Sequence, residues 1–101
     1  MISLSADPSV RQALPANDTY QEPIQVDVNT SVRVNPGAGG TITVLYTLSS
    51  VSEVEAGTAI WNTSPAFGAV AAVAEDEVIS RLTAIKAKQT GGVAGSIEVR
   101  R

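Results

Sequence analysis

The chain has 101 residues with neither histidine nor cysteine, and its 7 basic and 10 acidic side chains leave a formal charge of −3. These absences exclude zinc sites of the His/Cys type, cysteine nucleophiles, histidine general bases and disulfide frameworks. The mild acidic excess, without a run of Lys or Arg, gives no electrostatic basis for binding nucleic acid. No apolar stretch approaches the length of a membrane span and the first residues lack the pattern of a signal peptide, so we expect neither a membrane protein nor an exported one.

Residues 1–19 differ from the rest of the chain because turn-forming pairs interrupt any periodicity every few positions. These pairs are Asp7-Pro8, Leu14-Pro15 and Asn17-Asp18. We predict an extended N-terminal arm with room for one edge strand, followed by a folded domain over residues 20–101. An arm of this kind can attach to a neighbouring subunit, and its apolar residues Leu4, Val10 and Leu14 are the candidate contacts. Removal of the arm should therefore leave a folded body.

Alternation of apolar and polar residues begins after the arm. Ile24, Val26 and Val28 project to one side with polar residues between them, which is the pattern of a half-buried strand. Residues 35–40 are the strongest break in the chain, because a proline presets one turn dihedral and three glycines supply positive φ. Residues 41–48 are dense in β-branched and aromatic side chains and give the clearest strand prediction.

The second half of the chain contains two segments of ambiguous pattern. Residues 49–57 are polar and acidic with weak helical spacing, so we predict a long connection that ends at Gly57. Residues 68–74 are rich in alanine but too few to nucleate a helix alone, so a short strand is predicted. Residues 75–77 are predicted to form an acidic turn, and residues 91–95 a Gly-rich hairpin connection.

The predicted strands share β-favouring residues and Gly- or Pro-marked turns. They are residues 24–28, 32–34, 41–48, 58–62, 68–74, 81–90 and 96–100. About seven strands at this regular spacing indicate an all-β fold, an antiparallel β-sandwich of the jelly-roll or Ig-like type. A rhythm of strand, helix and strand is missing, which excludes a parallel sheet with a ligand site at its switch point.

Patterns that carry chemistry in other proteins are incomplete in this sequence. No spacing selects a pair of carboxylates for glycoside hydrolysis, so we expect no enzymatic activity. The acidic residues 75–77 lack the alternating spacing and the glycine of a calcium loop. The glycines of residues 37–40 lack the following helix and the lysine of a phosphate loop. We therefore expect no bound metal ion and no cofactor.

The aromatic residues leave two interpretations open. Trp61 and Tyr46 could form a platform on which a carbohydrate stacks. A single Trp among branched aliphatic residues is instead typical of a core position, and Tyr46 is in phase with Ile42 and Val44 of the same predicted strand. The core interpretation is preferred for both side chains.

Charge is distributed unevenly along the second half of the chain. Residues 53–77 carry five acids and no base, whereas residues 78–101 carry five bases and one acid, so their net charges are −5 and +4. If these segments face different sides, the acidic surface of one subunit can meet the basic surface of another in a head-to-tail ring. Cross-strand ion pairs within one sheet are the alternative. The candidate contact residues are Glu75, Asp76, Glu77, Arg81, Lys86 and Lys88.

Four motifs occur together in the last 70 or so positions. They are VRVNPGAGGTITVLYTLSS at residues 32–50, AGTAIW at residues 56–61, LTAIKA at residues 82–87 and the glycine pair at residues 91–92. In this order they resemble a group of small structural proteins of tailed bacteriophages. The penultimate strand departs from the group's pattern, because residues 86–89 are more basic here.

The resemblance implies a β-sandwich that is a non-enzymatic component of a virion. The first expected role is capsid decoration, in which a cement protein bridges and stabilises subunits of the major capsid protein, and the alternative is an accessory or ligand-binding module of a tail or fibre. The implied partners are the major capsid protein, other virion subunits and further copies of the chain in a homo-oligomer. The expected location is the capsid surface of the virion, after synthesis in the host cytoplasm, with no nucleic-acid or membrane partner.

Overall fold

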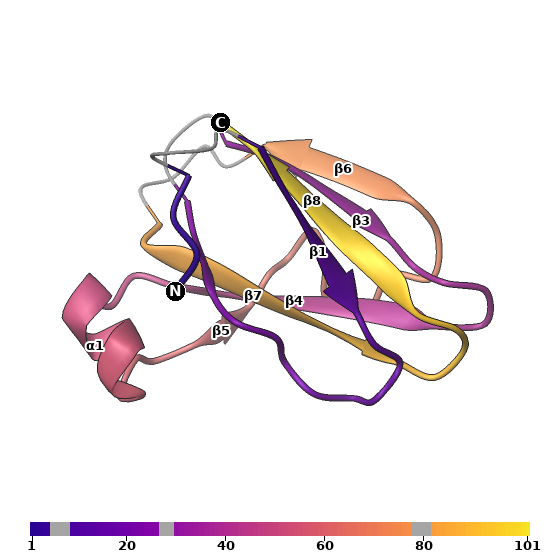
Figure 1. The fold of residues 1–101 in the computed structure, drawn as a ribbon, viewed down its shortest axis with the longest axis horizontal. Helices are drawn as coiled ribbons and strands as arrows, with labels where there is room; N and C mark the ends of the chain where they lie inside the picture. The colour runs from indigo at the N-terminus through magenta and orange to yellow at the C-terminus, as the bar shows by residue number, and fades with distance from the viewer. Residues whose placement is uncertain (5–8, 27–29, 78–81) are drawn as a thin grey trace.

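Two antiparallel sheets face one another in a computed structural model of the protein, which describes residues 1–4, 9–26, 30–77 and 82–101 (Figure 1). Sheet I has the strand order β1-β8-β3-β6, and sheet II has the order β2-β7-β4-β5. The strands of sheet I are β1 (Ser9–Leu14), β3 (Ser31–Asn35), β6 (Ala74–Glu77) and β8 (Gly95–Arg100). The strands of sheet II are β2 (Ile24–Gln25), β4 (Thr41–Thr47), β5 (Asn62–Thr63) and β7 (Ala84–Thr90). The helix α1 (Val51–Ala56) connects β4 to β5.

The strand pairing is that of a jelly roll. The first strand pairs with the eighth, the second with the seventh, the third with the sixth and the fourth with the fifth, all antiparallel. The pairs β3/β8 and β4/β7 then join these ribbons into two sheets, which is the double Greek key of an eight-stranded jelly roll. An Ig-like fold instead places its first two strands side by side in one sheet. The predicted all-β sandwich is therefore confirmed, and of the two predicted types the jelly roll is the one observed.

The core lies between the sheets because inward-facing residues alternate with outward-facing ones along each strand. In β4, for example, Ile42 and Val44 are buried while Thr43 and Leu45 are more exposed. Tyr46 follows this phase and packs partly buried against the core, as the sequence predicts. The buried apolar cluster consists of Leu4, Leu14, Ile24, Val26, Val32, Val34, Ile42, Val44, Phe67, Ile85, Ala87, Ile97 and Val99.

The segment predicted to be an arm is largely part of the sandwich. Strand β1 pairs with β8 over six residues, from Ser9 opposite Arg100 to Leu14 opposite Gly95. Leu14 is fully buried, Leu4 is 4% exposed, and Ile2 forms a parallel bridge with Ile24. We therefore expect removal of residues 1–19 to impair folding, because it would take away an edge strand and two core side chains.

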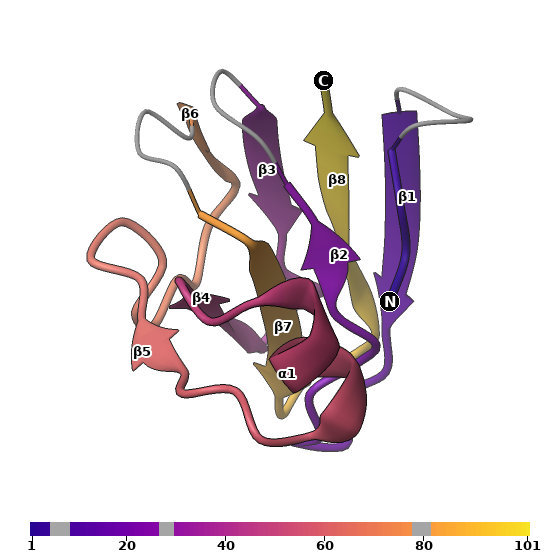
Figure 2. The ribbon, with the colours of Figure 1, turned by 90° about the vertical axis from the view of Figure 1, so that its left-hand side faces the viewer.

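Residues 49–57 contain a helix instead of the predicted connection. The Ser50 side chain accepts a hydrogen bond from the Glu53 backbone N–H at 3.2 Å, and Glu53 Oε1 accepts one from the Ser50 backbone N–H at 3.2 Å. This capping box begins α1, and Gly57, in the left-handed conformation with φ of 77°, ends it. The helix lies at the end of the molecule where β4 ends and β7 begins, and Figure 2 shows it from that side.

We expect Ser50→Ala to lower the free energy of unfolding by about 1 kcal/mol, since the substitution removes the N-cap of α1. Glu55→Ala is the matched control, because Glu55 is exposed in the same helix, outside the capping box, and alanine favours the helix there. Urea denaturation followed by circular dichroism measures both variants. Equal stabilities for the two variants would show that the capping box does not support the helix.

Three predicted elements of the second half differ from the structure. Residues 75–77 belong to the edge strand β6, which pairs with β3, and do not form a turn. In residues 68–74 the only β-bridge outside β6 joins Val70 to Ile42, and in residues 58–62 strand structure begins only with β5 at Asn62. The described residues consequently form eight strands, against the predicted seven. The predicted continuation of the first strand to Val28 lies outside the described residues.

One buried amide side chain holds together two loops at the end of the molecule opposite α1 (Figure 1). Each loop crosses from one sheet to the other, so the prediction of a hairpin connection at residues 91–95 is wrong. Gln89, at 0% exposure, accepts a hydrogen bond from the Gly37 backbone N–H at 3.0 Å through Oε1. Its Nε2 donates to the carbonyl oxygen of Gly91 at 3.1 Å and to that of Val93. The Val93 backbone N–H also donates to the Ala38 carbonyl at 3.1 Å. The loop between β3 and β4 is thus fastened to the loop between β7 and β8.

Candidate functional site

Strand β7 presents two lysines on the outer face of sheet II. Ile85 and Ala87 point into the core, so the alternating residues Lys86 and Lys88 point outward, each partly exposed. Lys86 lies opposite Leu45 of β4 in the strand register. Both lysines were predicted as contact residues, and the structure places them on the same face of the molecule, where a groove hollows the surface around Lys86.

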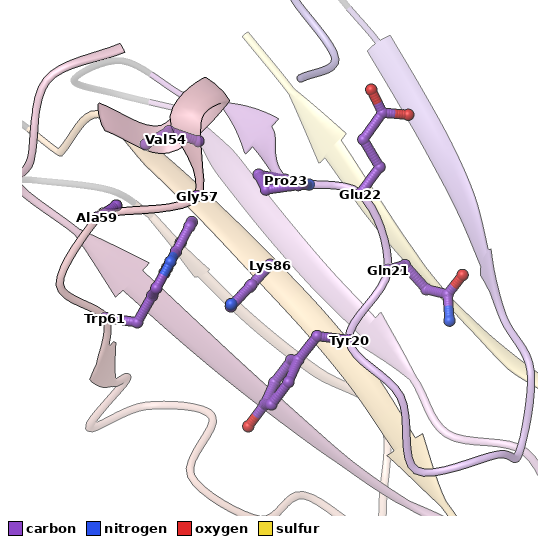
Figure 3. Close-up of a pocket in the computed structure, with 9 residues that line it drawn as sticks. All are labelled: Tyr20, Gln21, Glu22, Pro23, Val54, Gly57, Ala59, Trp61 and Lys86. Carbon is purple, nitrogen blue, oxygen red and sulfur yellow. The ribbon is translucent and has the colours of Figure 1, made fainter. Parts of the chain in front are cut away.

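The groove has a volume of about 440 Å³, and Figure 3 shows the residues that line it. One wall is residues 20–23, which run beside β7 because the Gln21 backbone N–H donates to the Ala87 carbonyl at 2.9 Å. The other wall runs from Gly57 to Trp61, and Val54 of α1 closes one end. Lys86 lies between the two walls, with the rings of Tyr20 and Trp61 on either side of it (Figure 3).

The position of Trp61 corrects the predicted core location. Its side chain is partly exposed in the wall of the groove and does not belong to the buried cluster. Two hydrogen bonds between side chains and the backbone of Ile60 hold this wall in place. Thr47 Oγ1 donates to the Ile60 carbonyl at 2.7 Å, and the Ile60 N–H donates to Ser49 Oγ at 3.0 Å. The aromatic partner across the groove is Tyr20, whereas the sequence pattern suggested Tyr46.

The ammonium group of Lys86 interacts with both rings. Its Nζ lies 4.4 Å from the centre of the Trp61 ring and 5.2 Å from that of Tyr20, which are cation–π distances. Burial lowers the pKa of Lys86, because removal from water disfavours the charged form. No carboxylate of the described part of the chain lies within 4.0 Å of this ammonium group.

Lys88, two positions further along β7, has a carboxylate partner. Its Nζ lies 2.8 Å from Asp18 Oδ1, and this hydrogen bond raises the pKa of Lys88. The pKa of Asp18 is lowered by its hydrogen bonds with Lys88 and Thr90 and by the nearby positive charge. Lys88 Nζ also lies 4.9 Å from the centre of the Tyr20 ring. The two lysines of one face therefore differ in that Lys88 has a carboxylate partner, whereas Lys86 has the two aromatic rings and, among the described residues, no carboxylate.

The apolar residues proposed as arm contacts pack against the core of the same chain. Leu4 and Leu14 are core residues, and Val10 is half-buried against the core. Their alternation along β1 turns Val10 and Leu14 toward the other sheet, which corrects their assignment as attachment residues. The structure does not bring them together with the groove.

The predicted acidic contacts lie in sheet I, on the edge strand β6. Glu75 and Asp76 are exposed there, and Glu77 is the last residue of the strand. Arg81 lies outside the described residues. The acidic contacts and the two lysines thus belong to different sheets, as the hypothesis of two oppositely charged surfaces requires.

Glu75 nevertheless takes part in ion pairing within sheet I. Its Oε1 lies 3.6 Å from Arg33 Nε on the neighbouring strand β3. Further along the same row Arg33 is opposite Glu98, which lies 4.0 Å from Arg11 of β1. Positive and negative side chains alternate across all four strands, so the cross-strand alternative is observed for this part of the acidic segment. This row of the outer face of sheet I largely neutralises itself.

Comparisons with protein-family models, curated proteins and solved structures found no match. Within the part of the chain that the structure describes, no cluster of three carboxylates is placed to hold a metal ion. Nor does a helix in these residues have the length and apolar character required to cross a bilayer. The site is therefore interpreted from its own geometry.

Proposed function

We propose that the protein is a non-enzymatic structural component of a virion, a decoration protein that bridges and stabilises subunits of the major capsid protein. The resemblance of residues 31–101 to small structural proteins of tailed bacteriophages is one support. The jelly roll is another, because this fold occurs in viral capsid domains, although the support is an analogy at the level of the fold. The proposal includes self-association and a location on the capsid surface.

The observation that carries the proposal is an exposed apolar patch at the α1 end of the sandwich. This α1-end patch consists of Leu48, Val51 and Ile60, which are 65%, 38% and 73% exposed. The hydrogen bonds that join residue 60 to residues 47 and 49 place Leu48 and Ile60 on neighbouring stretches of chain. Apolar side chains gathered at one end of a small domain are typical of a contact surface. Many modest contacts of this kind repeated over a shell add up through avidity.

The proposal predicts that capsids lacking the protein take it up and that the α1-end patch mediates the attachment. We expect the double substitution Leu48→Ser and Ile60→Ser to reduce occupancy on the order of tenfold, because it removes the central apolar contacts. Cosedimentation with purified capsids, followed by electron microscopy of the particles, measures the occupancy.

The matched control is Val93→Ser, since Val93 is 60% exposed in the loop between β7 and β8 at the opposite end of the sandwich. This variant should bind as the unchanged protein does. Failure of the unchanged protein to bind capsids would contradict the proposed function. Loss of binding in the Val93 variant alone would instead place the contact surface at the other end.

A ligand-binding module of a tail or fibre is the second candidate function. The specific observation in its favour is the groove of sheet II, in which Trp61 and Tyr20 flank a lysine that has no carboxylate partner among the described residues. The emission of Trp61, the single tryptophan, reports directly on occupation of this groove. A decoration protein without a ligand site would show no such response.

A further inference from the structure

We propose that the groove of sheet II binds a sugar that carries a carboxylate, such as a uronic acid or sialic acid unit of an anionic polysaccharide. The proposed contacts are Lys86 for the carboxylate and the rings of Trp61 and Tyr20 for the sugar ring. The inference rests on the second candidate function, and it does not depend on attachment to capsids.

An anion is indicated by the state of Lys86. Two other ammonium groups near the groove are compensated, since Lys88 pairs with Asp18 at 2.8 Å and the N-terminal amine pairs with Glu22 at 3.0 Å. Lys86 is partly removed from water without such a partner in the described part of the chain, so an incoming anion gains a charge-assisted contact. The aromatic rings beside it supply low-polarity walls that strengthen the contact.

A carboxylate fits this site better than a phosphate group. Phosphate recognition relies on several converging donors, as provided by Arg forks or by successive backbone N–H groups. The groove offers one ammonium group, which matches the single negative charge of a carboxylate.

A sugar ring fits better than a peptide because of the backbone beneath the groove. Strand β7 lies inside sheet II with β2 and β4 on its two sides, and its Ala87 carbonyl is already used by Gln21. An extended peptide therefore finds no free edge of β7 with which to pair. The volume of about 440 Å³ is at the small end of ligand sites and suits one or two rings.

Binding exchanges one contact of Lys86 for another. The ammonium group moves from the face of the Trp61 ring toward the ligand carboxylate, and the uncovered ring face then packs against the C–H face of the sugar. Gly57 leaves open space at the end of the groove, since apart from its own chain neighbours no atom of the described residues lies within 4 Å of where its Cβ would be.

The test is a titration of the full chain with glucuronic acid and N-acetylneuraminic acid, followed through the fluorescence of Trp61 and confirmed by calorimetry. Glucose is the neutral comparison, and a short acidic peptide represents the other class of ligand. We expect a saturable change in emission with an acidic sugar and binding of glucose weaker by about tenfold, because the charge-assisted contact to Lys86 is missing.

Lys86→Gln should lose this preference for acidic sugars, whereas Arg33→Gln should keep it. Each substitution removes one positive charge, but Lys86 lines the groove whereas Arg33 lies in sheet I, where it pairs with Glu75. Lys88 is unsuitable as the control, because its Nζ lies 4.9 Å from the centre of the Tyr20 ring. Circular dichroism shows whether each variant is folded, and Lys86→Arg supplies a variant that retains the charge. Equal losses in both Gln variants would overturn the site in favour of unspecific attraction. Binding of the acidic peptide without the sugars, or no binding of any probe, would overturn the proposed ligand class while leaving the capsid result unaffected.

Discussion

Gly92→Ala is expected to lower the free energy of unfolding by about 3 kcal/mol or more, which is a large effect for a single methyl group. Gly92 has a φ of 69°, in the left-handed region that L-residues avoid. A Cβ at this position would also collide with the Ala38 carbonyl oxygen and the Gly40 backbone nitrogen of the neighbouring loop. Both obstacles are backbone atoms, so the loop between β3 and β4 and the loop between β7 and β8 would have to separate. Urea denaturation of the variant measures the loss.

Gly57→Ala separates the two causes of this loss. Gly57 has a similar φ of 77°, but apart from its own chain neighbours no atom of the described residues lies within 4 Å of the place that the added methyl group would take. Only the backbone strain of about 1 kcal/mol is therefore expected. A loss in the Gly92 variant no larger than that in the Gly57 variant would show that the loops are not in close contact.

Gln89→Leu is expected to destabilise the protein by about 2–4 kcal/mol, although leucine has a similar volume. The change leaves the Gly37 backbone N–H and the carbonyl groups of Gly91 and Val93 without the partner that the amide supplies. Hydrogen exchange of the Gly37 amide should accelerate together with the loss of stability. Chemical denaturation and exchange followed by NMR measure the two effects.

The control for this prediction is Gln12→Leu in β1. Gln12 Nε2 donates to the Glu22 carbonyl at 3.0 Å, but its Oε1 is buried without a hydrogen-bond partner among the described residues. The variant loses one hydrogen bond but also loses one buried acceptor that has no partner, and these two effects nearly cancel. We therefore expect its free energy of unfolding to change by no more than about 1 kcal/mol. A Gln12 variant as destabilised as the Gln89 variant would contradict the special role of the loop-fastening amide.

The elements with strong local patterns were predictable from the sequence. The strand predicted at residues 41–48 is β4, and the one predicted at residues 96–100 is most of β8. In both, apolar and polar residues alternate along most of the strand, so the side that faces the core is encoded locally. The break at residues 35–40 likewise coincides with the loop between β3 and β4, because its proline and glycines restrict the backbone directly.

The elements that depend on distant partners were not predictable in the same way. In β1 the inward positions include Gln12, which hides the alternation, and the strand is stabilised by β8 at the other end of the chain. In β6 three consecutive acidic residues favour the prediction of a turn. In the structure Arg33 of β3 lies opposite Glu75 and compensates its negative charge. The capping box of Ser50 and Glu53 is a local signal for α1 that the weak helical spacing of the following residues obscured.

The candidate site was predictable only in part. The basic character of β7 identified Lys86 and Lys88, because outward-facing residues follow from the alternation. Tyr20 and Trp61 flank the groove because residues 20–23 and the chain after α1 both lie across sheet II. No pattern of neighbouring residues in the sequence indicates this arrangement. The lone tryptophan therefore looked like a core residue.

The sequence by itself determined a chain without histidine or cysteine chemistry and with the strand-forming composition of an all-β sandwich. Composition and alternation suffice for this, because they act through each residue's own side chain and its immediate neighbours. Only the tertiary structure decided that the strands roll into a jelly roll, that the supposed arm is an edge strand, and which of two neighbouring lysines pairs with Asp18. These outcomes depend on contacts between residues far apart in the chain, such as Lys88 with Asp18, whose energies exist only once the fold has formed.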